Sequence, residues 1–156
     1  MDSKFVAHVS ALRPKLDELL SMNPVTPVTL PSKMPARGVY LLSEGDKHLY
    51  VGRSNEIRAR LGRHSKVGAT HRQAAFAFRL ARLATGNIKP TYKKGEGSRA
   101  ALMEVPEFVA AFDHAKARIR AMDVRFVEET DPVRQALLEI YVAETLETPF
   151  NDFDNH

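Results

Sequence analysis

The chain has 156 residues, enough for one domain with a buried core, and its hydrophobic and charged fractions of 44% and 27% are ordinary for a globular protein. The absence of cysteine excludes disulfides, iron–sulfur clusters and thiolate zinc sites. No apolar run approaches the length of a membrane span, and the first residues lack the basic start of a secretory signal. We therefore expect a cytoplasmic protein that enters no membrane.

The net charge of +4 is unevenly distributed along the chain. Residues 53–99 contain twelve Lys or Arg against two acids, whereas residues 139–156 contain five acids and no Lys or Arg. A basic middle segment with an acidic tail indicates either a polyanionic partner that docks on one face or an ordinary solvated surface. Composition alone leaves both interpretations open.

The N-terminal third predicts a helix followed by an extended linker. Residues 4–21 place apolar side chains at helical spacing, although Pro14 is expected to kink or break the helix. The apolar positions are Phe5, Val9, Leu12, Leu16, Leu19 and Leu20. Residues 23–36 contain four prolines, so we expect an extended linker with at most an edge strand near residues 28–30. Residues 1–36 are thus predicted to form a segment separate from the main domain.

A β-hairpin and two helices are predicted next. Residues 38–42 and 48–52 are rich in β-branched and aromatic side chains and flank a Glu-Gly-Asp turn. Ser54 or Asn55 is expected to cap a helix that ends near residue 65. A further helix is predicted over residues 71–83. Its expected core positions are Ala75, Phe78, Leu80 and Leu83.

The remaining elements complete an α+β prediction. Residues 85–99 are expected to form a mobile basic loop, and residues 105–121 a helix. The alternation over residues 123–128 predicts a third strand, and Asp131-Pro132 begins a last helix that ends near residue 146. We expect residues 37–156 to form a small three-stranded antiparallel or mixed sheet flanked by helices, with an inserted basic loop and helix around residues 85–121.

Two tyrosine tripeptides in the hairpin carry a family resemblance. Gly38-Val39-Tyr40 is separated by nine residues from Tyr50-Val51-Gly52, and Arg60 and His64 follow on the next predicted helix. Near the C-terminus, Glu139 precedes Asn151 by twelve residues, with Pro149 just before Asn151. In this order, the residues resemble the signature of the GIY-YIG nuclease family. The helix glutamate is similar to that of the bacterial excision-repair incision subunit, and the histidine to that of homing endonucleases.

The same residues can also be read physically, and each has an ordinary alternative. Tyr40 and Tyr50 on neighbouring strands can converge on one site, or pack across the strands. Arg60 and His64 share a helix face that also carries core residues, or lie at the surface. Glu139 stands among apolar neighbours, where its carboxylate could bind a hard cation or form the polar edge of an amphipathic helix.

The resemblance implies an endonuclease that hydrolyses phosphodiester bonds in nucleic acid, with DNA favoured over RNA. It implies a Mg²⁺ or Mn²⁺ ion bound by Glu139, Arg60 on the scissile phosphate, Tyr40 as general base and Tyr50 positioning the attacking water. His64 would be the base or would orient the water, and Asn151 completes the implied catalytic set. A phenol with a pKa of about 10 is a base near neutral pH only if cations favour phenolate.

Further cations are candidates for contacts with the nucleic-acid backbone, which give affinity without sequence choice. They are Arg53, Arg58, Arg63, Lys66, Arg72, Lys93 and Lys94. Two alternatives to an active nuclease remain open at this point. One is a catalytically silent nucleic-acid-binding module on the same scaffold. The other is a structural protein whose basic segment binds a protein partner.

Overall fold

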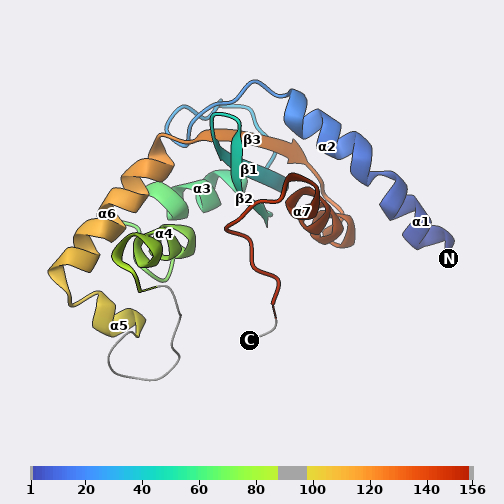
Figure 1. The fold of residues 1–156 in the computed structure, drawn as a ribbon. Helices are drawn as coiled ribbons and strands as arrows, with labels where there is room; N and C mark the ends of the chain where they lie inside the picture. Colours follow the sequence, from blue (N-terminus) through green and yellow to red (C-terminus); the bar gives the residue numbers. More distant parts are fainter. Residues whose placement is uncertain (1, 88–97, 155–156) are drawn as a thin grey trace. The chain divides into compact units, whose positions relative to one another are not determined.

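The computed structural model describes residues 2–87 and 98–154 and confirms the predicted α+β fold (Figure 1). In the described part of the chain, no helix is both long and apolar enough to cross a membrane. The elements, in chain order, are α1 (Ser3–Ser10), α2 (Leu12–Ser21), β1 (Gly38–Glu44), β2 (Lys47–Ser54), α3 (Ile57–Ser65), α4 (Ala75–Thr85), α5 (Arg99–Leu102), α6 (Pro106–Arg120), β3 (Asp123–Glu128) and α7 (Pro132–Leu146).

The three strands form an antiparallel sheet in the order β2-β1-β3. Strand β1 is central, and β2 and β3 are its two edges. The hairpin turn is closed by Gly45, whose φ of +62° suits a residue without a Cβ. Register pairs Tyr40 with Gly52 on β2 and with Phe126 on β3. The third strand was predicted over residues 123–128, and these are the bounds that the structure gives.

The chain divides into two compact units. The first joins Met1–Arg60 to Met122–His156 and contains the sheet, α1, α2 and α7. The second is Leu61–Ala121 and contains α4, α5 and α6. The predicted N-terminal segment, residues 1–36, belongs to the first unit, and the second unit begins upstream of the insertion expected around residues 85–121.

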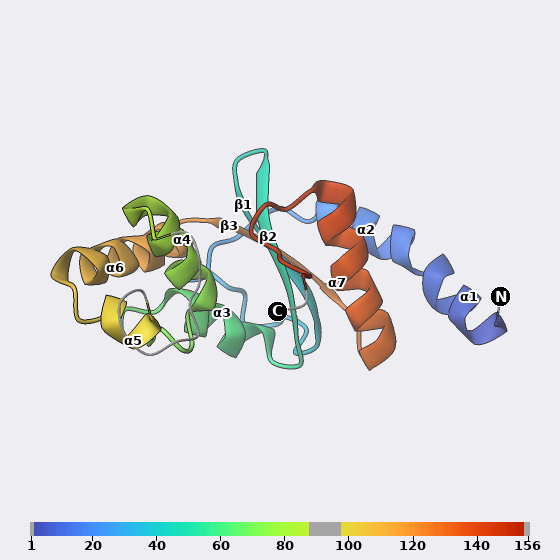
Figure 2. The ribbon, with the colours of Figure 1, turned by 60° about the horizontal axis from the view of Figure 1, so that its bottom comes forward.

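Helices α2 and α7 form the core of the first unit with one face of the sheet. They lie side by side in both ribbon views (Figures 1 and 2). The strand residues in this core all have odd numbers, in keeping with the twofold alternation of a strand. The buried residues of this core are Leu12, Leu16, Leu19, Val39, Leu41, Val51, Val127, Leu138, Val142 and Ala143. Tyr40 lies on the opposite face of β1.

The single N-terminal helix expected over residues 4–21 is instead two helices. The break falls at Ala11, between α1 and α2. Pro14 explains the break, because it has no N–H to donate to the carbonyl of Ser10 and its ring crowds that turn. Phe5 and Val9 on helix α1, two of the apolar positions at helical spacing, are more than 40% exposed and lie outside the core.

The proline-rich linker carries no strand near residues 28–30. Val28 is exposed, and the structure has only a single β-bridge in this described segment, between Val25 and Val124. Both backbone bonds of that bridge are formed, Val25 N–H to Val124 O at 3.0 Å and Val124 N–H to Val25 O at 2.6 Å. The linker therefore crosses the β3 edge at one point instead of adding a strand.

Helices α4 and α6 pack side by side in the second unit through aromatic residues (Figure 2). The Phe78 ring lies 5.0 Å from that of Phe108, and both are buried. Helix α4 begins at Ala75 instead of residue 71, and Ala75 and Leu83 are exposed, which corrects two predicted core positions. Helix α5 was not predicted. Most of the expected basic loop, with Lys93 and Lys94, lies outside the described residues.

Candidate active site

A polar cavity of about 670 Å³ lies in the first unit and brings together five of the site residues predicted from the sequence. They are Tyr40, Tyr50, Arg53, Arg60 and Glu139. Strands β1 and β2, the first turn of α3 and the middle of α7 contribute these side chains. Tyr40 and Glu139, which are far apart in the sequence, therefore line the same cavity.

The two tyrosines occupy the same face of the hairpin. Tyr50 is the diagonal neighbour of Tyr40 across the β1–β2 pair, because Tyr40 is opposite Gly52. Their ring centroids are 6.4 Å apart and the ring planes are tilted by 42°. Tyr40 is 1% exposed, whereas Tyr50 is partly exposed. The predicted convergence of two phenols on one site is thus present in the fold.

Gly52 allows the Tyr40 phenol to cross the edge strand. A Cβ built on Gly52 would overlap the Tyr40 hydroxyl and the ring carbon that bears it. Any side chain at residue 52 would therefore displace the phenol. Glycine is required at residue 52 because the Tyr40 phenol approaches its backbone closely. The backbone angle is not the reason, since Gly52 does not have a positive φ.

The surroundings of Tyr40 favour its neutral phenol. Burial raises its pKa well above 10.0, and the neighbouring Tyr50 and the charge of Glu139 act in the same direction. Arg60 opposes them by favouring phenolate. Desolvation is the largest of these effects, so the cations of this cavity do not by themselves produce the phenolate that a Tyr40 base would require.

Glu139 and Arg53 form a loose pair across the cavity. Arg53 Nε lies 3.8 Å from Glu139 Oε1, and the side chains are 44% and 23% exposed. Burial raises the pKa of Glu139, and Arg53 and then Arg60 partly offset this rise. Desolvation outweighs the two arginines, so the cost of burying the charged carboxylate is only partly offset. A cation closer to Glu139 would stabilise the charged form further.

The position of Arg60 follows from how α3 begins. Ser54 Oγ accepts the backbone N–H of Glu56 at 2.9 Å, and the N–H of Ile57 donates to the carbonyl of Ala36 at 2.9 Å. These bonds fix the first turn of α3 against the start of β1. Arg60 lies at the end of this turn and is exposed on the cavity side, where its charge acts on both Tyr40 and Glu139.

The donor set around Glu139 fits a divalent cation of a particular kind. No group of three or more His, Cys, Asp or Glu residues that could hold a metal occurs in the described part of the chain. A zinc-like site built entirely from protein ligands is therefore not formed by these residues. Mg²⁺, however, is commonly bound by one or two carboxylates together with water and substrate phosphate oxygens. The single undercompensated carboxylate of Glu139 fits that arrangement.

His64 and Asn151 are not among the residues that line this cavity. His64 belongs to the second unit, where it is 3% exposed and edge-on to Phe76 with 6.3 Å between ring centroids. Asn151 belongs to the first unit and bonds the outer edge of β2. Its Oδ1 accepts the Val51 N–H at 2.9 Å, and its Nδ2 donates to the Val51 carbonyl at 2.7 Å.

No protein-family model, curated protein or solved structure matches this chain. A functional interpretation therefore depends on the side chains of the cavity and on their chemistry.

The predicted backbone-binding cations are spread over both units. Arg53 lines the cavity, and Arg58 is exposed on α3, where its Nη2 donates to the carbonyl of Pro31. The others that the structure describes are exposed in the second unit. They are Arg63, Lys66 and Arg72.

Besides Gly52 of the second tripeptide, five further cavity residues were not predicted as site residues, namely Arg37, Ser54, Asn55, Glu56 and Gln135. Arg37 immediately precedes the first tripeptide, and Asn55 follows β2, so proximity to the motif was their only sequence signal. Gln135 is one helical turn before Glu139 on α7, a spacing that places both on one face. It is 2% exposed, and its Nε2 donates to the carbonyl of Glu129 at 3.0 Å and to Asn55 Oδ1 at 3.4 Å.

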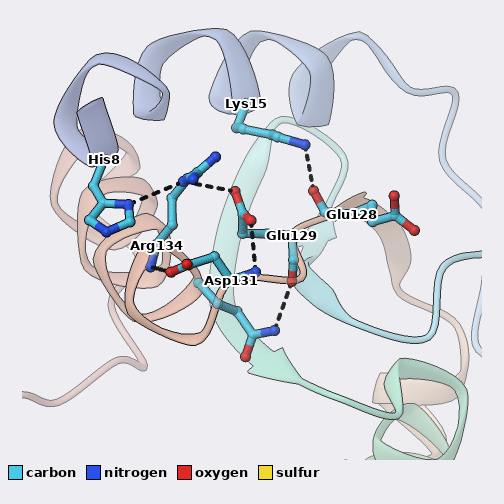
Figure 3. Close-up of polar contacts among 7 residues, drawn as sticks. His8, Lys15, Glu128, Glu129, Asp131 and Arg134 are labelled. Atoms are coloured by element: carbon cyan, nitrogen blue, oxygen red, sulfur yellow. Dashed lines mark hydrogen bonds and ion pairs between the residues drawn. The ribbon is translucent and has the colours of Figure 1, made fainter. Parts of the chain in front are cut away.

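The loop that carries Glu129 is held by a polar network beneath α1 (Figure 3). Arg134 lies between His8 and Glu129, with Nε 3.4 Å from His8 Nδ1 and 3.7 Å from Glu129 Oε1. Glu129 Oε2 accepts the N–H of Asp131 at 3.1 Å, and Asp131 caps α7 by accepting the N–H of Arg134. The hydrogen bond from the Arg134 N–H is the largest of several contacts that lower the pKa of Asp131. This network fixes the start of α7, and with it Gln135 and Glu139.

Proposed function

We propose that this chain is a metal-dependent endonuclease that hydrolyses phosphodiester bonds, with DNA as its substrate. The observation that carries the proposal is the convergence of Tyr40, Tyr50, Arg60 and Glu139 on one polar cavity. Two phenols, a guanidinium and a half-buried carboxylate are the groups needed to orient water, bind a phosphate and hold a hard cation. The resemblance to GIY-YIG nucleases names the same residues from sequence alone.

Arg60 is the proposed contact for the scissile phosphate. A guanidinium remains charged at all relevant pH values and donates two parallel hydrogen bonds to phosphate oxygens. Its exposed position on α3 leaves it accessible to a ligand in the cavity. In the transition state, when negative charge accumulates on the phosphate, this contact strengthens and lowers the barrier.

Tyr40 and Tyr50 are proposed to hold the attacking water in line with the phosphate. With its pKa raised by burial, Tyr40 enters the reaction as a neutral phenol. A neutral phenol both donates and accepts a hydrogen bond, so it can orient a water molecule before any proton is transferred. Transfer of the water proton to Tyr40 requires the small phenolate fraction, which increases with pH.

Glu139 is the residue proposed to hold Mg²⁺ or Mn²⁺. When bound, such a cation would supply charge that stabilises the phosphate oxygens and the leaving 3′ oxygen. The protein's own contribution is a carboxylate whose desolvation is only partly offset by Arg53 at 3.8 Å. Arg53 is then available to move from Glu139 to a phosphate oxygen when substrate enters.

The distribution of charge between the two units supports a polyanionic substrate. Residues 61–121, the second unit, contain twelve Lys or Arg against four Asp or Glu, whereas the first unit contains eleven against fifteen. The charge excess therefore lies outside the unit that contains the cavity. Cations of this kind neutralise backbone phosphates and raise affinity for nucleic acid of any sequence.

The proposal is tested by incubating the purified protein with supercoiled plasmid and Mg²⁺ or Mn²⁺. Wild-type protein is expected to nick the plasmid, and Glu139→Gln, Tyr40→Phe and addition of EDTA are each expected to abolish nicking. Glu144→Gln is the matched control, because Glu144 is exposed on the same helix. Nicking that persists in Glu139→Gln would contradict the assigned metal ligand.

A silent binding module is the alternative that this assay separates from an enzyme. In that case, wild-type protein would retard DNA in a salt-dependent manner without cutting plasmid or branched substrates. A protein that neither binds nor cuts nucleic acid would favour the structural alternative.

A further inference from the structure

The cavity extends past the motif residues to a second polar group. Arg37 and Asn55 line it where β1 begins and β2 ends, next to the Gly38–Ser54 pair of the register. Tyr40 is three residues further along β1, which places its backbone about 10 Å from that of Arg37. Arg37 and Tyr40 therefore occupy different positions along the cavity.

The backbone around Arg37 is held from three sides. The carbonyl of Arg37 accepts the N–H of Glu129 at 3.1 Å, and the preceding carbonyl, of Ala36, accepts the N–H of Ile57 at 2.9 Å. On its other side, Gly38 packs so closely on β3 that a Cβ would overlap the carbonyl of Val127. Arg37 therefore projects from a fixed point, which reduces the entropy lost when it binds a ligand.

The Arg37 guanidinium has no structural role that the described residues reveal. Over residues 2–87 and 98–154, its side chain makes no hydrogen bond or ion pair. Arg53, by contrast, pairs with Glu139 in the same cavity. An exposed arginine on a rigid backbone, without an acidic partner in the described chain, is suited to bind an anion that enters from solvent.

Gln135 orients Asn55 in the same part of the cavity. The Gln135 amide donates to Asn55 Oδ1 at 3.4 Å while its other hydrogen bond anchors it to the Glu129 carbonyl at 3.0 Å. Because Oδ1 of Asn55 is the acceptor in this pair, its Nδ2 is left to donate to a ligand. The network of Figure 3 fixes Glu129, so it acts on Asn55 through Gln135.

We infer that Arg37 and Asn55 form a second phosphate-binding position, which holds a phosphodiester of the same strand beside the one that is cut. Both groups are donors, neither is used elsewhere as a donor in the described chain, and both lie along the strand direction from Tyr40. The inference rests on the proposed function for its substrate class. Gln135 is a positioning residue in this arrangement, because it acts through Asn55.

The test separates binding from cutting by measuring DNA binding in EDTA. Fluorescence anisotropy of a short labelled duplex, recorded over a series of salt concentrations, gives the affinity and its salt dependence. Arg37→Gln is expected to weaken binding roughly tenfold at low salt and to reduce the magnitude of the log–log salt slope by about 0.9, the value for one lost phosphate contact. Asn55→Asp, which keeps the Oδ1 acceptor but adds negative charge, is expected to weaken binding as well.

Arg13→Gln is the matched control, since it removes one exposed arginine of the same unit that does not line the cavity. It should leave the salt slope unchanged. If Arg37→Gln binds like Arg13→Gln while the wild-type protein cuts plasmid with Mg²⁺, the second position is wrong and the nuclease proposal stands. If Arg37→Gln lowers the slope but no metal supports cutting, the phosphate position stands and the nuclease proposal fails.

Absence of salt-dependent DNA binding by wild type would overturn the inference itself. Melting curves for each variant verify that the fold is retained.

Discussion

The side chain of Asn151 pairs with the backbone of Val51 as a neighbouring strand would. One amide group accepts the Val51 N–H at 2.9 Å and donates to the Val51 carbonyl at 2.7 Å. Thr148 Oγ1 donates to the same Asn151 Oδ1 at 2.8 Å. Since β2 is an edge strand, this pairing satisfies backbone groups that otherwise have no partner in the sheet. Val51 lies between Tyr50 and Gly52, so the contact also fixes the strand that shapes the cavity.

Asn151→Ala is therefore expected to reduce stability more than chemistry. Loss of both bonds to the buried Val51 should cost about 1–3 kcal/mol in the free energy of unfolding. At saturating substrate, we expect the cleavage rate to fall less than roughly tenfold, against a hundredfold or more for a variant that loses a charge contact to the transition state. Urea unfolding and single-turnover cleavage measure the two effects.

Asn23→Ala serves as the control for Asn151→Ala, because Asn23 is exposed in the linker. It should change neither quantity. A hundredfold loss of cleavage in an Asn151→Ala protein of unchanged stability would assign Asn151 to the reacting groups instead of to the strand edge.

Gly52→Ala should damage the site by steric overlap alone. The added methyl group would collide with the Tyr40 hydroxyl, while the backbone angle of Gly52 remains acceptable to alanine. Overpacking of this kind typically costs about 1–3 kcal/mol, and a displaced Tyr40 should abolish cleavage. Gly68→Ala is the matched control, because a Cβ there meets nothing within 4 Å. The melting temperature and the plasmid-nicking activity of the two variants are compared. If Gly52→Ala matches Gly68→Ala in both, Tyr40 can move aside without loss of function, which contradicts the prediction.

The elements that could be predicted are those with a strong local pattern. Residues 123–128 alternate cleanly, and Asp131-Pro132 combines a cap with a favourable first position, so β3 and the start of α7 were located within one residue. The prediction of one helix over residues 4–21 was wrong for a local reason too, since Pro14 divides the segment into two helices at Ala11. The exposure of Phe5 and Leu83 depends on which neighbours the fold supplies, and spacing along a helix carries no such information.

The candidate site was predictable only where a motif named its residues. Tyr40, Tyr50, Arg60 and Glu139 were identified in the sequence and share a cavity in the structure. Gln135 could not be found in this way, because its importance lies in a hydrogen bond to Asn55 across eighty positions of chain. The pKa of Tyr40 also depends on burial, which only tertiary packing determines.

Glu139→Gln is expected to stabilise the fold at neutral pH while it abolishes cleavage. The folded-state pKa of Glu139 is raised above 4.5, mainly by burial, so the ionised carboxylate is disfavoured in the folded protein. Its effect on stability is favourable below pH 4.5 and is lost as pH rises through the folded pKa. The neutral amide avoids that loss, so Glu139→Gln should be more stable than the wild-type protein at pH 7.

The measurement for Glu139→Gln is urea unfolding of both proteins across pH, without metal. The stability difference should be smallest near pH 4 and should grow towards neutrality. Glu144→Gln on the same helix is the control and should show no such trend. A variant that is less stable than wild type at pH 7 would mean that the pair with Arg53 outweighs the burial of Glu139.

The pH dependence of cleavage tests the role of Tyr40 as a base. Burial holds the folded-state pKa of Tyr40 well above 10.0, so the phenolate fraction increases tenfold for each unit of pH until that value is reached. If the phenolate takes the proton of the attacking water, the logarithm of the single-turnover rate should rise with a slope near one, without a plateau below about pH 10. Tyr50→Phe, which keeps Tyr40 intact, should retain this slope at a lower rate. A plateau near neutral pH would require a base with a lower pKa, and it would leave Tyr40 to orient the water as a neutral phenol.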